Sequence, residues 1–124
     1  MDMDTVLIVD DEVDICYFLK RNLNRKDFSA SFVNTIKEAE LAVDTEHPSI
    51  LLLDNHLPDG LGLDFALKVK KEHPEIKIVM ITAHDTQNDR SDANKNGIDY
   101  FLSKPFMMTE VYKAIDIVKS RSQI

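Results

Sequence analysis

The sequence lacks most of the features that mark a secreted or membrane-bound protein. Cys16 is the only cysteine among 124 residues, so the chain has no internal disulfide. Apolar runs such as residues 6–9 and 50–53 are far shorter than the ~20 residues that a membrane span needs. The acidic start, residues 1–4, lacks the positive charge that opens a signal peptide. We expect a cytoplasmic protein without a membrane partner.

Basic charge is also scarce. The chain has 15 Lys and Arg against 22 Asp and Glu, which gives a formal net charge of -7. A protein that binds nucleic acid normally carries a basic patch or stripe. The modest lysine cluster within residues 68–77 has the pattern of a solvated helix face. We therefore expect no direct contact with nucleic acid.

What the sequence does contain is a regular alternation of short apolar runs with amphipathic stretches. Its composition, 44% hydrophobic and 30% charged, is that of an ordinary globular domain. Runs such as residues 5–9 and 49–53 are strongly apolar and end in polar residues, which is typical of strands buried on both faces of a sheet, whereas residues 29–33 alternate between polar and apolar. Strands are predicted at residues 5–9, 29–33, 49–53, 76–81 and 98–102.

Helices are predicted between and after these strands. Residues 13–23 repeat apolar side chains at helical spacing, Phe18 among them, and Cys16 is expected to be a small buried hydrophobe. The remaining clear helices are expected from residue 36 to before His47, over residues 63–72 and over residues 108–118.

The segment between Thr82 and Gly97 is polar almost throughout, so a fourth helix there should be short, displaced or mobile. Five strand–helix units without a linker predict one α/β domain over residues 1–124, with its core at about 5–118. The sheet should be parallel, with helices on both faces. We expect no output domain within this chain.

Chemically capable side chains follow four of the five predicted strands. The first strand ends in Asp10 and Asp11, the third in Asp54, the fourth in Thr82 and the fifth in Lys104. Functional groups of an open parallel sheet gather at the carboxyl ends of its strands. These residues are therefore expected to form one site.

The chemistry of such a site follows from its charges. Carboxylates that converge in a small volume repel one another, and a hard divalent cation such as Mg²⁺ or Mn²⁺ relieves the repulsion. An ionised Asp54 is a nucleophile that needs no general base and forms an acyl phosphate. Lys104 and the cation supply positive charge to the phosphoryl oxygens, and the Thr82 hydroxyl supplies a hydrogen bond.

Four segments together resemble one family. They read VLIVDDE at residues 6–12, LLLDNHLPDGLG at 51–62, IVMITAH at 78–84 and DYFLSKPF at 99–106. In this order and at these strand ends they closely resemble the receiver domains of two-component response regulators, including the chemotaxis regulators. The resemblance implies a flavodoxin-like, doubly wound sheet of five strands in the order 2-1-3-4-5.

The resemblance also implies residue roles. Asp10, Asp11 and Asp54 would hold Mg²⁺ together with the backbone carbonyl of His56. Asp54 would accept the phosphoryl group from a histidine kinase or a phosphotransfer protein. Lys104 would pair with Asp54 or with its phosphate.

Further implications concern the switch. The Lys104–Pro105 bond resembles the cis peptide of the family, and Thr82 and Phe101 resemble its switch pair, in which the aromatic ring moves inward when the threonine turns to the phosphate. The face formed by the fourth helix, the fifth strand and the last helix would then bind a downstream protein. The protein would be a monomer or a phosphorylation-dependent dimer. Such a domain is a signalling module with at most weak self-dephosphorylation, not a metabolic enzyme.

Other interpretations stay open at this point. His56 and His84 are candidates for tuning the lifetime of the acyl phosphate, or for a Zn²⁺ site with the nearby acids. A domain that keeps the fold for interactions independent of phosphate is the main alternative. A haloacid-dehalogenase-type phosphatase would need an aspartate where His56 stands, and an FMN carrier would need a phosphate-binding loop where residues 10–12 are acidic.

Overall fold

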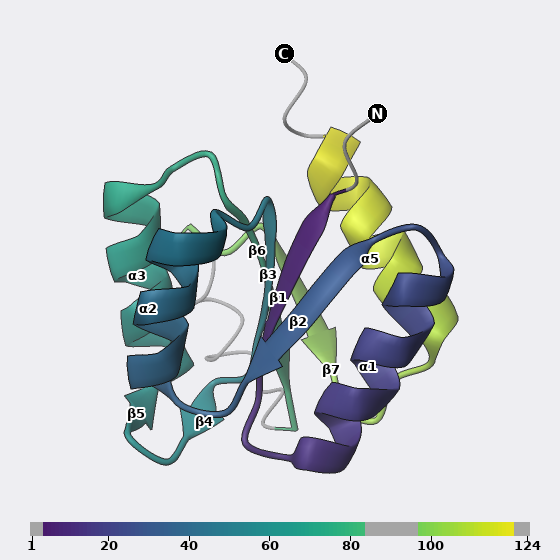
Figure 1. Ribbon diagram of the computed structural model, residues 1–124, viewed down its shortest axis with the longest axis horizontal. Coiled ribbons are helices and arrows are strands. Elements are labelled where there is room, and N and C mark those ends of the chain that lie inside the picture. The colour runs from purple at the N-terminus through teal and green to yellow at the C-terminus, as the bar shows by residue number, and fades with distance from the viewer. Residues whose placement is uncertain (1–3, 84–96, 121–124) are drawn as a thin grey trace.

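The computed structural model describes residues 4–83 and 97–120, which form three layers with a parallel sheet in the middle (Figure 1). The strands of this sheet are β1 (Thr5–Val9), β2 (Ser29–Val33), β3 (Ile50–Leu53), β6 (Lys77–Thr82) and β7 (Tyr100–Ser103). Their spatial order is β2-β1-β3-β6-β7, and each neighbouring pair is parallel. In chain order these are the second, first, third, fourth and fifth strands of the sheet, which confirms the order 2-1-3-4-5.

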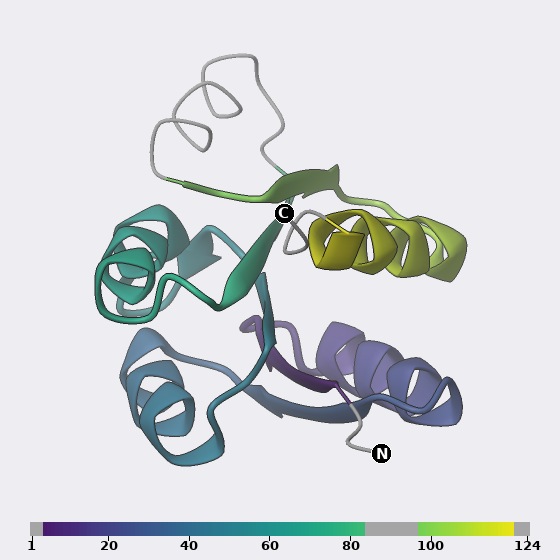
Figure 2. The same ribbon diagram turned by 90° about the horizontal axis from the view of Figure 1, so that it is seen from above.

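Helices cover both faces of the sheet, as the sequence predicted. They are α1 (Val13–Arg25), α2 (Ile36–Glu46), α3 (Gly62–Glu72) and α5 (Met108–Ser120). Figure 2 shows α2 and α3 against one face, and α1 and α5 against the other. The predicted weak fourth helix and His84 fall within residues 84–96, outside the described residues. None of the described helices is long and apolar enough to cross a membrane.

The central strand β3 is buried because it is apolar at every position. Its four residues are each at most 1% exposed. Leu51 and Leu53 pack into the core on the side of α2 and α3, while Ile50 and Leu52 pack on the side of α1 and α5. Burying a leucine or isoleucine side chain stabilises a fold by about 1.5–3 kcal/mol. The residue that follows β3, Asp54, is therefore attached to a fully buried strand.

Helix α1 ends two residues later than predicted, and one residue of its predicted apolar face is exposed. Its buried positions are Cys16, Leu19 and Leu23, so the expected burial of Cys16 is confirmed. Phe18, expected on the apolar face, is 48% exposed, and that expectation is wrong. Residues 16, 19 and 23 are spaced by three and four, which places them on one face, and Phe18 lies one residue outside this series.

A short antiparallel hairpin lies between β3 and α3, in a segment with Pro58, Gly60 and Gly62. It consists of β4 (His56–Leu57) and β5 (Gly60–Leu61). Between them, the Asp59 carboxylate accepts hydrogen bonds from the backbone amides of Ile36 and Lys37, at 2.9 and 3.1 Å. These bonds satisfy two free amides at the start of α2 and fasten the hairpin to that helix.

Candidate functional site

The carboxyl ends of β1, β3, β6 and β7 meet at one edge of the sheet. Asp10, Asp54 and Lys104 directly follow their strands, and Thr82 is the last residue of β6. The structure therefore brings together the residues that the sequence placed at one site. They line or adjoin a cavity of about 240 Å³, whose walls are formed by Asp11, Glu12, Asp54, His56, Thr82, Ala83 and Lys104.

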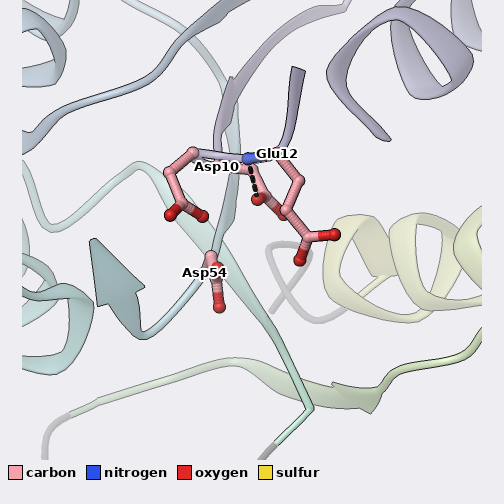
Figure 3. Close-up of side chains that lie close together, drawn as sticks. Asp10, Glu12 and Asp54 are labelled. Carbon is pink, nitrogen blue, oxygen red and sulfur yellow. Dashed lines mark hydrogen bonds between the residues drawn. The ribbon is translucent and has the colours of Figure 1, made fainter. Parts of the chain in front are cut away.

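Four carboxylates form the acidic part of the site. Asp10, Asp11, Glu12 and Asp54 each offer an oxygen, and these oxygens lie within 4.8 Å of one another. Asp10 and Asp54 are buried, whereas Asp11 and Glu12 are exposed. Figure 3 shows the carboxylates of Asp10, Glu12 and Asp54 close together. Glu12 was not predicted as a site residue, although its place in an unbroken acidic run was the signal for it.

Lys104 supplies the positive charge that opposes this cluster. Its Nζ lies 2.9 Å from Asp10 Oδ2 and 2.9 Å from Glu12 Oε1. The distance to Asp54 Oδ2 is longer, at 3.6 Å. The resemblance implied Asp54 or its phosphate as the partner, but in this structure the ammonium lies closer to Asp10 and Glu12. The peptide bond between Lys104 and Pro105 is cis, as expected.

Burial and mutual repulsion perturb the two inner carboxyls. Burial raises the pKa of Asp10, and hydrogen bonds from the Glu12 amide and from Lys104 oppose the shift. Burial, and next the charge of Asp10, raise the pKa of Asp54, and the charge of Lys104 again opposes the shift. The raised pKa values mean that ionising either carboxyl costs free energy in the folded state, and a bound cation would offset this cost.

The backbone of Asp10 is held from two other elements. Its carbonyl oxygen accepts a hydrogen bond from Asn34 Nδ2 at 2.8 Å and another from Cys16 Sγ at 3.2 Å. Its amide donates to the carbonyl of Val33, at the end of β2. Burial, and then the charge of Asp10, raise the pKa of the Cys16 thiol to about 12, so this donor stays protonated. The supporting role of Asn34 was not foreseen, because nothing in its sequence context marks it.

Asp54 is positioned by its own loop and by a close approach of α3. Its amide donates to the carbonyl of Val9, and its Oδ1 accepts from the His56 amide at 3.5 Å. A Cβ at Gly62 would lie 2.2 Å from the Asp54 carbonyl oxygen. The first residue of α3 must therefore lack a side chain for the loop to hold Asp54 where it lies.

The donor set fits a hard divalent cation. Mg²⁺ prefers oxygen ligands, keeps several waters and binds through one or two carboxylates plus phosphate oxygens. The oxygens of the acidic cluster, at the edge of an open cavity, meet this description. His56 lines the cavity and its side chain is exposed, while a Zn²⁺ site would also require His84, outside the described residues.

The two switch candidates lie on neighbouring strands. Thr82 is 1% exposed and borders the cavity. Phe101 is half-buried and packs against the core on the side of α2 and α3. It is paired in register with Met80, two residues before Thr82 in β6, so Thr82 and Phe101 project from the same face of the sheet.

A doubly wound sheet with a buried aspartate, flanking acids, a threonine and a lysine at its carboxyl edge defines a class of phosphoryl-accepting signalling domains. The profile of the response regulator receiver domain matches residues 6–116. The chain belongs to this family.

Curated relatives agree with this assignment. The chain is 36% identical over 105 residues to response regulator protein PilR of Pseudomonas aeruginosa, covering 85% of this chain and 24% of PilR. It is 30% identical over 119 residues to the alkaline phosphatase synthesis transcriptional regulatory protein PhoP of Bacillus subtilis, covering 96% of this chain and 50% of PhoP. The chain thus spans a quarter to a half of the length of these two relatives.

Solved structures share the fold. The receiver domain of HemR from Leptospira biflexa, in its non-phosphorylated form, is 27% identical, with a TM-score of 0.86 and coverage of 93% of each chain. A CheY-like receiver domain protein from Methanospirillum hungatei is 22% identical and superposes with a TM-score of 0.92 over 99% of this chain and 100% of the other. The second likeness concerns the fold alone.

Proposed function

We propose that this receiver domain accepts a phosphoryl group on Asp54, from a phosphohistidine of a histidine kinase or of a phosphotransfer protein. The observation that carries the proposal is the position of the Asp54 carboxylate. It is buried, faces a cavity, and has Lys104 3.6 Å away and two further aspartates beside it. Family membership supports the same role.

The residues present are suited to this transfer. An Asp54 oxygen attacks phosphorus, the phosphorus–nitrogen bond of the phosphohistidine breaks, and the electron pair of that bond returns to the imidazole nitrogen. Lys104 and Thr82 line the same cavity as Asp54, where the ammonium and the hydroxyl would bind the phosphoryl oxygens. Asp10, Asp11, Asp54 and the backbone carbonyl of His56 would hold Mg²⁺ or Mn²⁺, which neutralises the charge on the transferring group when bound.

The output of the domain is a change of its protein-binding face. On phosphorylation Thr82 turns toward the phosphoryl group, and Phe101 moves further into the core that it already borders. The face that includes β7 and α5 then binds a downstream protein. A cytoplasmic location, a monomer or phosphorylation-dependent dimer, and a single domain without direct contact to nucleic acid stay predictions.

The domain acts as a signalling module, with at most weak hydrolysis of its own acyl phosphate. His56 borders the cavity, so its side chain is placed to steer or block the attacking water. Substitution of His56 by alanine is expected to change the dephosphorylation rate, and an unchanged rate would remove this histidine from the account. The corresponding proposal for His84 stays a prediction from sequence.

The experiment that tests the proposal is intact-mass spectrometry after incubation with acetyl phosphate. We expect the wild type to gain one phosphoryl group only when Mg²⁺ is present, and Asp54→Asn to gain none. No gain in the wild type would favour a receiver fold that works without phosphate. A gain that survives Asp54→Asn would mean that another residue is the acceptor.

A further inference from the structure

The Lys104 ammonium is shared unequally among three carboxylates. It lies within hydrogen-bond distance of Asp10 and Glu12, and beyond that distance from Asp54. The side chain of Lys104 is 11% exposed and that of Glu12 is 57% exposed. Glu12 thus reaches from the solvent side to an ammonium that is itself largely buried.

The partners of Lys104 differ in what the proposed function asks of them. Asp10 is expected to hold the cation, and Asp54 both to hold the cation and to attack phosphorus. Glu12 is the one carboxylate in contact with Lys104 that has neither task. Asp10 is already engaged on both oxygens. Its Oδ1 accepts from the Glu12 amide at 2.9 Å (Figure 3), and its Oδ2 accepts from Lys104.

We propose that Glu12 is a positioning residue that holds the Lys104 ammonium away from Asp54, and so keeps the Asp54 carboxylate open to the cation. The inference rests on the proposed function, whose chemistry requires an accessible Asp54. It assigns a task to the one acidic residue of the cluster that the family resemblance leaves without one.

The physical argument concerns competition for one ammonium. A lysine has three donors and no acceptor, so it takes the nearest available carboxylate oxygens. Without the charge of Glu12, the ammonium would satisfy itself on Asp10 and Asp54, which are both buried and lie within 3.6 Å. A cation would then have to displace a lysine from both carboxylates. With Glu12 in place, the Lys104 ammonium also donates a hydrogen bond to an exposed carboxylate that is not expected to bind the cation.

The test is a double-mutant cycle read by Mg²⁺ binding to the unphosphorylated chain. Amide NMR titrations would give the dissociation constants of the wild type, Glu12→Gln, Lys104→Ala and the double variant. Asp14→Asn is the matched control, since Asp14 is an exposed acid in the first turn of α1 outside the acidic cluster. It reports the effect of removing one nearby negative charge in general.

We expect Glu12→Gln to weaken Mg²⁺ binding by about 1.5- to 5-fold more than Asp14→Asn does, the range of one partly exposed ion pair. In the Lys104→Ala background this excess should vanish, because the competing ammonium is gone. An equal effect of Glu12→Gln in both backgrounds would overturn the inference and leave the proposed function standing. Failure of the wild type to bind Mg²⁺ would also overturn it, since no carboxylate would then need to be kept open.

The outcome is independent of phosphoryl transfer. Suppose that the effects of Glu12→Gln and Lys104→Ala on Mg²⁺ binding depend on each other, but the chain takes no phosphoryl group from acetyl phosphate. This result would support the positioning role of Glu12 and contradict the proposal that Asp54 accepts the phosphoryl group. Melting temperatures of the variants serve as the control for folding. Glu12 is the N-cap of α1 without a side-chain capping bond, so Glu12→Gln should unfold close to the wild type.

Discussion

The substitution Gly62→Ala tests whether the backbone approach beside Asp54 is as close as the structure has it. A Cβ at this position would lie 2.2 Å from the Asp54 carbonyl oxygen and 3.0 Å from the Asn55 Cα. The separation of 2.2 Å is far shorter than any real contact of a Cβ atom. The Asp54 carbonyl oxygen is a backbone atom, so it cannot move away by rotation of a side chain. Either α3 or the loop that carries Asp54 must move.

The expected magnitude follows from the cost of overpacking. Forcing one methyl group into a tightly packed place costs about 1–3 kcal/mol, which lowers the melting temperature of a domain of this size by roughly 4–12 °C. Since the displaced atom belongs to Asp54, Mg²⁺ affinity should fall together with stability. Circular dichroism measures the first effect and an amide NMR titration measures the second.

A matched control lies on the same helix. Leu67 is 50% exposed on α3, and Leu67→Ala is expected to leave Mg²⁺ affinity unchanged and to shift the melting temperature only slightly. Replacing glycine by alanine inside a helix normally stabilises it, by about 1 kcal/mol. A Gly62→Ala variant that is as stable as the wild type, or more so, would therefore refute the close approach and the account of how Asp54 is placed.

Three further predictions concern the charges and supports of the site. Asn34→Ala removes one of the two side-chain hydrogen bonds to the carbonyl of buried Asp10, and should cost about 0.5–1.5 kcal/mol in urea unfolding and weaken Mg²⁺ binding; unchanged values for both would contradict its supporting role. The cation-free domain should lose stability as the pH rises from about 4 toward neutrality, because the raised carboxyl pKa values of Asp10 and Asp54 mean that the folded state holds protons that the unfolded state has lost. Thermal unfolding of Asp54→Asn should show a higher melting temperature at neutral pH than that of the wild type, and a weaker dependence of the melting temperature on pH. A pH dependence as steep as that of the wild type would contradict the contribution of Asp54. Mg²⁺ at a hundred times its dissociation constant should stabilise the wild type by about 2.7 kcal/mol, and Asp11→Asn should need more Mg²⁺ for the same gain in melting temperature.

Much of the fold could be predicted because most of the strands are short, largely apolar and followed by polar residues, and β2 alternates between polar and apolar positions. That pattern fixes a parallel sheet buried on both faces, and the end of each strand then gives the place of Asp10, Asp54 and Lys104. The predicted strand limits differ from the structure by up to two residues, for instance residues 98–102 against Tyr100–Ser103. Strand ends depend on individual hydrogen bonds, which no apolar pattern encodes.

The contacts that hold the site could not be predicted in the same way. The preference of Lys104 for Asp10 and Glu12 over Asp54 is decided by differences of less than 1 Å. Asn34 reaches Asp10 across 24 positions of sequence, and a lone asparagine after a strand gives no sign of its partner. Such pairings depend on where the backbone places each side chain, and spacing along the chain does not contain that information.

The central claim is that the side chain of Asp54 carries the phosphoryl group, and chemical trapping tests it most directly. Borohydride reduces an acyl phosphate to an alcohol and leaves a free carboxylate unchanged. After treatment with acetyl phosphate, Mg²⁺ and borohydride, peptide mass spectrometry should find homoserine in place of aspartate at position 54 alone. Homoserine at position 10 or 11, or aspartate unchanged at all three positions in a chain that has gained a phosphoryl group, would contradict the account.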